Sequence, residues 1–267
     1  MAVAASPVAD LEEAEAVHGD ALGIVLSVSL IGICGLLALL VVRFGKRRLE
    51  KGGPKELRSV LYPEIARKIV HIGVSNWFFI YYFVFERSFW AIVGLCAFAV
   101  VNAAFNLSGA MGSLFAQAPS KRNWGMVYYP LSIVLLIVLA DLGFGDRLCV
   151  GCALIGMGYG DGLAALVGMR FGRHGFHSSL TGGGGNAKHG HKTVEGSLTM
   201  FLAVFASFVL LNALLGDSGV LSALCFGFLA ALASTFAEAY TPSGLDNVTV
   251  PLVIYVLAAL MRLVWVL

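Results

Sequence analysis

One acidic residue, Asp161, interrupts a long apolar stretch that carries no other charge. A carboxylate at that depth in a membrane span costs on the order of a few kcal/mol, so such acids usually mark a functional site or an ion path. Small residues recur at every fourth position around it: Gly156, Gly160, Ala164, Gly168 and Gly172. On a helix they form one stripe, which favours close packing against another helix or close approach of a ligand to the backbone. We predict that Asp161 is functional, and the stripe is compatible with both interpretations.

A second polar group precedes the apolar stretch that begins at Ser197. Lys192 and Glu195 flank Thr193, and Gly196 follows them. Thr193 is a good N-cap for a helix, and an acid such as Glu195 suits the first turn because it faces the positive end of the helix dipole. Alternatively, Lys192 and the helix N-terminus face a phosphate group. The spacing leaves both interpretations open.

A third polar group lies between the last two apolar stretches. Asp246 and Asn247 stand together in a segment without Lys or Arg, and Glu238 lies inside the apolar stretch before it. Asp and Asn favour turns, which is the structural interpretation of this pair. The acid inside the neighbouring span favours a functional one, because it lies near the same membrane face.

A fourth group, Arg67, Lys68 and His71, opens the second apolar stretch. Cations at the edge of a span commonly extend toward the membrane surface, whereas His71 lies inside the apolar run. Oxygen ligands suit a hard cation such as Mg²⁺, and cations suit phosphates. The combined acids and bases therefore predict phosphoryl or nucleotidyl transfer, where catalysis is mostly positioning and charge neutralisation. They are expected on one face of the membrane: Asp161, Glu195, Glu238 and Asp246 with Arg67, Lys68, Arg170 and Lys192.

Cysteines and histidines offer a weaker metal-binding pattern. Cys149 and Cys152 form a C-x-x-C at one end of an apolar stretch, and a group of histidines follows its other end. At 1.5 Å per helical residue the two ends are roughly 30 Å apart, so a shared zinc site is not expected. We expect the cysteines to pack in the protein interior and the histidines to belong to a solvated polar loop. The histidines are His174, His177, His189 and His191.

The elements that position these residues follow from the composition. The chain has 267 residues, of which 58% are hydrophobic and only 13% charged. Soluble domains are about 25% charged, and disordered chains are charge-rich and poor in aromatic residues. Both classes are excluded, and the chain is read as an integral membrane protein.

Eight apolar stretches are long enough, or nearly so, for the roughly 20 residues that a spanning helix needs. We therefore predict an all-α polytopic fold of about eight transmembrane helices, because these stretches are too long and uniform for barrel strands. Two of the stretches are short, so seven spans are also compatible with the sequence. The stretches are 21–42, 69–85, 89–107, 126–142, 148–168, 197–215, 220–240 and 251–267.

Basic residues set the orientation of these spans. With the N-terminus outside, the inner segments 43–68, 108–125 and 169–196 carry nine, two and four Lys and Arg, which is fifteen of the eighteen in the chain. This distribution obeys the positive-inside rule. We expect the chemistry at the cytoplasmic face, and the outer loops are too short for an outer domain.

The domain organisation follows from the same pattern. Residues 1–20 are predicted to form an acidic, non-cytoplasmic tail. Residues 21–62 are predicted to form an anchor helix with a basic cytoplasmic loop, and 63–267 the catalytic transmembrane domain. The N-terminal segment lacks the basic region of a secretory signal, so the first span is expected to be retained. The expected location is a bacterial inner membrane or an organelle membrane such as that of the endoplasmic reticulum or plastid.

The four groups, taken in their order along the chain, resemble four motifs of the polyprenol kinase family. This family comprises dolichol, phytol and farnesol kinases and related CTP-dependent diacylglycerol kinases. The resemblance runs from about residue 63 to the C-terminus. Many family members carry an acid where Ala165 and Leu245 stand in this chain. The matching residues are Asp161, Ala164, Gly168 and Gly172 for D-x-x-A-x-x-x-G-x-x-x-G, Arg67, Lys68 and His71 for R-K-x-x-H, Lys192, Glu195, Gly196 and Ser197 for K-[ST]-x-E-G-S, and Asp246, Asn247 and Pro251 for D-N-x-x-x-P.

The resemblance implies transfer of the γ-phosphate of CTP to a membrane isoprenoid alcohol, with Mg²⁺ as cofactor. Asp161 and Asp246 would hold Mg²⁺, with Glu238 assisting or acting as the base. Nucleotide binding would involve Ala164, Gly168, Arg170, Gly172, Lys192, Glu195, Gly196, Arg67, Lys68, His71 and Asn247.

Two other functions stay open at this point. A phosphatidate cytidylyltransferase, which makes a CDP-lipid, shares a similar pattern of acids and lysine. A transporter or scaffold would use Asp161 and Glu238 along an ion path, although a path needs polar groups across the whole depth of the membrane. We expect no nucleic-acid partner, and the sequence leaves the oligomeric state and the identity of the alcohol open.

Overall fold

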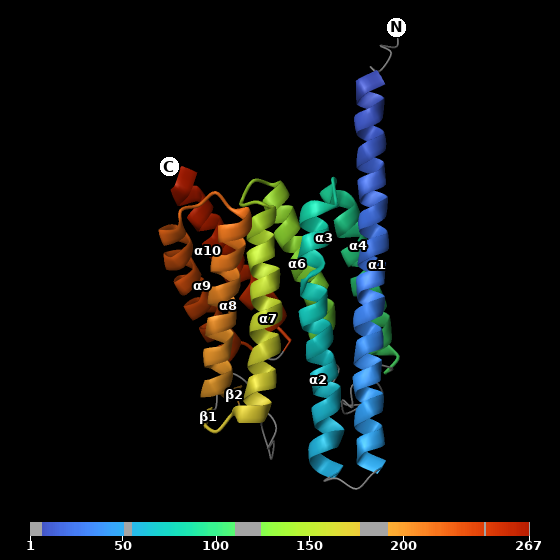
Figure 1. Cartoon of the computed structure of the whole chain (residues 1–267), viewed down its shortest axis with the longest axis vertical. Helices are drawn as coiled ribbons and strands as arrows, with labels where there is room; N and C mark the ends of the chain where they lie inside the picture. The colour runs from blue at the N-terminus through green and yellow to red at the C-terminus, as the bar shows by residue number, and fades with distance from the viewer. Residues whose placement is uncertain (1–6, 51–54, 110–123, 177–191, 243, 267) are drawn as a thin grey trace.

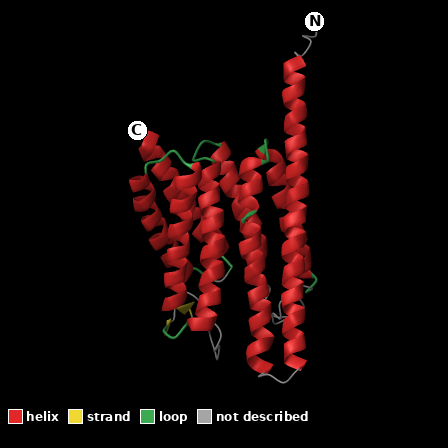
Figure 2. Cartoon of the chain, viewed as in Figure 1, coloured by secondary structure: helices red, strands yellow, loops and turns green. Residues whose placement is uncertain are grey.

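The computed structural model describes residues 7–50, 55–109, 124–176, 192–242 and 244–266, and it is a bundle of long helices (Figure 1). Helices account for nearly all of the described chain, and two short antiparallel strands lie where α7 ends and α8 begins (Figure 2). The elements are α1 (Pro7–Glu50), α2 (Lys55–Ser75), α3 (Trp77–Phe83), α4 (Ser88–Leu107), α6 (Gly125–Asp141), α7 (Arg147–Phe171), β1 (Gly175–Phe176), β2 (Lys192–Thr193), α8 (Val194–Leu215), α9 (Val220–Tyr240) and α10 (Asp246–Val266).

The protein is an all-α, multi-pass membrane protein, as the sequence predicts. Within the described residues, six helices are long and apolar enough to cross a membrane, namely α1, α4, α7, α8, α9 and α10. Helix α6 is a shorter apolar helix. The count of eight spans and the orientation stay predictions.

The stretch 69–85, predicted as one helix, is divided between α2 and α3 at Asn76. The Asn76 side chain donates to the backbone oxygen of Ile72 at 2.8 Å, and Tyr159 of α7 donates to the Asn76 side chain at 3.2 Å. A side-chain amide that bonds to nearby carbonyls competes with the helical ladder, which explains the interruption.

The basic segment 43–68, predicted as a cytoplasmic loop, is largely helical. Helix α1 continues to Glu50 and α2 begins at Lys55. Lys, Arg, Glu and Leu are good helix formers, so these segments extend the helices on both sides of residues 51–54. The predicted acidic tail is likewise helical from Pro7. Helix α1 packs along α2 at one edge of the bundle and extends beyond the other helices at its N-terminal end (Figure 1).

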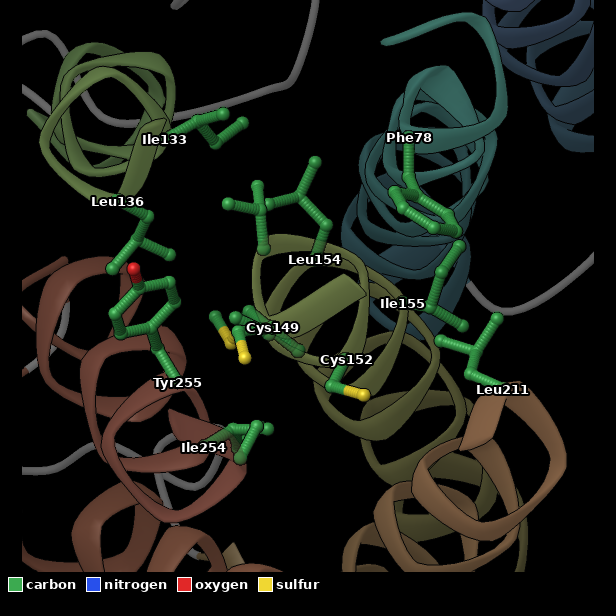
Figure 3. Packing of buried hydrophobic residues seen from close by; sticks show 14 of the residues in the cluster. Phe78, Ile133, Leu136, Cys149, Cys152, Leu154, Ile155, Leu211, Ile254 and Tyr255 are labelled. Atoms are coloured by element: carbon green, nitrogen blue, oxygen red, sulfur yellow. The ribbon is translucent and has the colours of Figure 1, made fainter. Parts of the chain in front are cut away.

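Helix α7 forms the centre of the bundle. It packs against α2, α3, α6, α8 and α10. In an apolar stretch of 18 residues of this helix 67% are buried, against 11–33% in such stretches of the other five long apolar helices. Figure 3 shows side chains of α7, including Leu154 and Ile155, among residues from the surrounding helices. The central helix is therefore the one that carries Asp161.

Candidate active site

Asp161 of α7 forms an ion pair with Lys68 of α2. Lys68 Nζ donates to Asp161 Oδ2 at 2.6 Å, and the two side chains are 4% and 14% exposed. His71, three residues after Lys68 and therefore on the same face of α2, places its Nε2 3.6 Å from the same carboxylate oxygen. The first and fourth sequence motifs thus meet inside the bundle.

Glycines on one face of α7 allow α2 and α3 to approach this closely. A Cβ atom at Gly158 would overlap the side chain of Ser75, one at Gly162 would overlap Ile72, and one at Gly151 would overlap Phe78. The spacing of seven and four residues puts the three glycines on one side of the helix. Sequence analysis missed this face, although the spacing was visible.

The predicted stripe faces a different neighbour, helix α8. A Cβ at Gly160 would lie 2.6 Å from Met200 Sδ, and one at Gly168 would lie 3.0 Å from Thr193 Oγ1. Gly196 of α8 approaches the backbone oxygen of Ala164 in return. The stripe is therefore a helix-packing seam, and approach of a nucleotide to Gly168 and Gly172 stays a prediction.

Lys192 of β2 forms an ion pair with Glu238 of α9. Its Nζ donates to Glu238 Oε1 at 2.6 Å and also to the backbone oxygen of Glu238. Thr193 then accepts a hydrogen bond from the backbone N–H of Gly196 at 3.1 Å, which is the N-cap of α8 that the sequence suggested. Capping fixes where α8 begins and so holds Lys192 beside α9.

Asp246 and Asn247 begin α10. Asp246 Oδ1 accepts from the backbone N–H groups of Gly244 at 2.9 Å and Asn247 at 3.0 Å, so one carboxylate oxygen stabilises the turn. Gly244 adopts a φ of +99°, which an L side chain rarely does. Asp161 and Asp246 both act electrostatically on Glu238, and Asp246 also interacts with Lys68 and Lys192. Lys192, Glu238, Asp246 and Lys68 therefore share one electrostatic neighbourhood with Asp161.

Arg67 extends this group of charges. It forms an ion pair with Glu64, one turn earlier on α2, and it interacts electrostatically with Asp161 and Asp246. Sequence analysis did not single out Glu64. Its carboxylate fixes the position of the guanidinium group, on which Asp161 and Asp246 also act electrostatically.

Arg170, Gly172 and Glu195 lie at the end of the bundle rather than among these buried pairs. Together with Phe171, Arg173 and His174 they line an open cavity of about 430 Å³. Glu195 Oε1 lies 2.7 Å from His174 Nδ1, and this contact joins the start of α8 to the turn after α7. The two arginines give this cavity a basic wall.

The carboxylates do not form a ready-made metal site. No three His, Cys, Asp or Glu side chains lie close enough together to bind a metal ion within the part of the chain that the structure describes. Asp161, Glu238 and Asp246 are nevertheless oxygen donors in one electrostatic neighbourhood. Mg²⁺ is usually held by one or two carboxylates together with substrate phosphates, and this donor set fits that mode of binding.

The C-x-x-C cysteines are buried and free, and Cys152 accepts from Asn212 Nδ2 at 3.4 Å. They lie in the hydrophobic core, as expected for packing residues (Figure 3). Three of the four histidines of the polar segment, His177, His189 and His191, lie outside the described residues.

Comparison with known proteins decides the family. A protein of Synechocystis named phytol kinase is 33% identical over 192 residues, which cover 71% of this chain and 76% of that protein. This chain belongs to the polyprenol kinase family. The protein is therefore a multi-pass membrane kinase. No protein-family model and no solved structure matches it.

Proposed function

We propose that this membrane kinase transfers the γ-phosphate of CTP to the hydroxyl group of a membrane isoprenoid alcohol such as phytol, farnesol, dolichol or a similar polyprenol. The phytol kinase relative supports the substrate class. The observation that carries the proposal is the buried ion pair of Lys68 and Asp161, together with the ion pair of Lys192 and Glu238, on which Asp161 acts electrostatically. Two lysines and three acids that act on one another electrostatically can hold a charged donor next to an acceptor that stays in the bilayer.

The acids are the proposed Mg²⁺ ligands. Asp161 and Asp246 would hold the ion, with Glu238 assisting or accepting the proton of the alcohol. When bound, Mg²⁺ supplies positive charge that neutralises the phosphate oxygens. Asp246 already uses Oδ1 in the turn before α10, which orients its carboxylate.

The bases are the proposed phosphate contacts. An ammonium group has three donors, so a lysine that already binds a carboxylate can also donate to a phosphate oxygen. Lys192 would therefore hold Glu238 and the donor at once. Arg67 and Arg170 would balance further phosphate charge, and Asn247 would orient a ligand. His71, Lys68, Glu195, Gly196, Ala164, Gly168 and Gly172 remain proposed parts of the nucleotide site.

Tracing of labelled CTP tests the proposal. The purified protein is incubated with Mg²⁺, each of phytol, farnesol, dolichol, diacylglycerol and phosphatidate in turn, and CTP labelled at either the γ or the α phosphate. A kinase labels the lipid only from the γ position. Label transfer from the α position to a phosphatidate substrate would instead identify a cytidylyltransferase. Solute movement in vesicles without CTP consumption would identify a transporter.

Replacement of Asp161 by Asn tests the site. Asp161→Asn keeps the size of the side chain and removes its charge, so we expect a loss of phosphotransfer of at least 100-fold if it holds Mg²⁺ in the transition state. The control is Asp217→Asn, because Asp217 is 88% exposed and lies in the connection between α8 and α9. A well-folded Asp161→Asn protein with full activity would contradict the proposed arrangement.

A further inference from the structure

A small cavity adjoins the buried ion pair of Lys68 and Asp161. It lies between α2, α4, α6 and the start of α10, and its volume is about 50 Å³. A water molecule needs at least about 10–15 Å³ of such space, so the cavity admits a hydroxyl group with its carbon but not a triphosphate. Its polar lining residues are Arg67, His71, Asn102, Tyr129 and Asn247.

Two of these side chains have buried polar atoms without a hydrogen-bond partner among the described residues, namely Tyr129 Oη and His71 Nε2. Tyr129 is only 6% exposed, and the two rings are 4.6 Å apart. Nearly all buried polar groups in proteins are hydrogen-bonded, and an unpaired one is costly. Two such atoms without a hydrogen bond, on residues that line one cavity, therefore indicate a ligand that bonds to both.

A hydroxyl group matches this pair of atoms. It donates one hydrogen bond and accepts others, so it can bond to a phenol and an imidazole together. Because His71 Nε2 lies 3.6 Å from Asp161 Oδ2, a hydroxyl held here would also lie next to the Asp161 carboxylate. The cavity thus places an acceptor directly beside the proposed phosphate site, with which it shares Arg67, His71 and Asn247.

The rest of the cavity wall suits a hydrocarbon chain. Val70 and Val74 of α2, Phe98 of α4 and Met126 of α6 supply it. Helix α4 also presents exposed Val101 and Phe105 on its outer surface, where lipid would lie. Helices α2 and α4 both line the cavity but are scarcely packed against each other along the described residues. These apolar side chains suit the first carbons of a lipid alcohol whose polar end lies in the cavity.

We propose that this cavity binds the hydroxyl end of the lipid alcohol and that Tyr129 and His71 hold the hydroxyl group. The proposal rests on the proposed kinase function and adds to it a binding residue, Tyr129, which no sequence motif contains. Asn102 supports the site, because its Nδ2 donates to the backbone oxygen of Met126 at 3.0 Å and so fixes α4 to α6 beside the cavity.

The test is Tyr129→Phe, which removes a single oxygen atom. We expect the KM for the alcohol to rise about fivefold to tenfold, as for the loss of one hydrogen bond, while the KM for CTP stays unchanged. The melting temperature should not fall, because the substitution removes an unpaired buried polar atom. The matched control is Tyr255→Phe, since Tyr255 Oη is also buried and has no hydrogen-bond partner in the described part of the chain, but lies beside Gly145, in the connection before α7. Its kinetics should equal those of the unmodified protein.

The two proposals fail in different ways. If the unmodified protein phosphorylates an alcohol but Tyr129→Phe leaves the KM for the alcohol unchanged, the cavity does not bind the hydroxyl and the kinase function stands. An equal rise in the KM values for alcohol and CTP would also overturn the cavity proposal. If the unmodified protein phosphorylates no alcohol, the proposed function itself fails.

Discussion

Replacement of Lys68 by Met removes the cation that compensates Asp161 inside the bundle. The two side chains are 4% and 14% exposed and are joined by a contact of 2.6 Å. Removal of one partner of a buried ion pair typically costs about 3–5 kcal/mol, because the other charge is left uncompensated. We expect a value of about 3 kcal/mol, since Asp161 retains some access to solvent. For a chain of this size each kcal/mol lowers Tm by about 2–4 °C, so the expected shift is about 6–12 °C.

The assay is thermal unfolding of the purified protein in detergent, followed by tryptophan fluorescence. Arg47→Met is the control, because Arg47 is exposed on α1 and its loss should leave Tm unchanged. The double variant Lys68→Met with Asp161→Asn removes both charges, so it should regain most of the lost Tm but no activity. Unfolding of Lys68→Met at the temperature of the unmodified protein would refute the ion pair. A double variant no more stable than the single one would refute it equally.

Two further predictions concern the packing of α7 and the ion pair at its N-cap, Asp146. Gly158→Ala adds a methyl group against α2 and should lower the free energy of unfolding by about 1–3 kcal/mol. The control is Gly94→Ala, whose site on α4 is open, and it should raise the free energy of unfolding by up to about 1 kcal/mol. Shifts of the melting temperature with the same sign in both variants would contradict this. Burial disfavours the charged form of Asp146, but the backbone N–H of Cys149 and the side chain of Arg262 outweigh burial and hold the pKa of Asp146 below its usual value. Because that pKa is lower in the folded protein, the contribution is present at neutral pH and is lost as the pH falls through the lowered pKa. Arg262→Met should therefore cost about 1 kcal/mol at pH 7 and weaken the acid dependence of Tm, which unfolding curves across the acid range will measure.

The sequence located the helices well, because length and hydropathy are local properties. Each predicted span corresponds to a described helix or, for 69–85, to parts of two. Thr193 was recognised as a cap for the same reason, since an N-cap depends on residues three positions apart. Helices α1 and α2 extend further than hydropathy predicts, because the charged residues at their ends are good helix formers although they are not apolar.

The sequence predicted which residues belong to the site but not which of them contact one another. Lys68 was assigned to phosphate and Asp161 to metal, and their mutual contact was not foreseen. Tyr129 and Asn102 were missed altogether, although each is a polar residue inside an apolar stretch. That signal was present, but a tyrosine or asparagine in a span is interpretable only when its neighbours on other helices are known.

By itself the sequence determined the membrane class, the all-helical fold and the motifs that indicate phosphoryl transfer, because these depend on composition and on spacing along one helix. Only the tertiary structure decided which helices meet. Lipid is as apolar as the helix surfaces, so the hydrophobic effect does not select neighbours in a bilayer, and small residues and polar contacts do so instead. Helix α2 packs against the face of α7 that carries Gly158 and Gly162, and α8 packs against the face that carries Gly160 and Gly168. That choice brought Lys68 to Asp161 and left the cavity beside them.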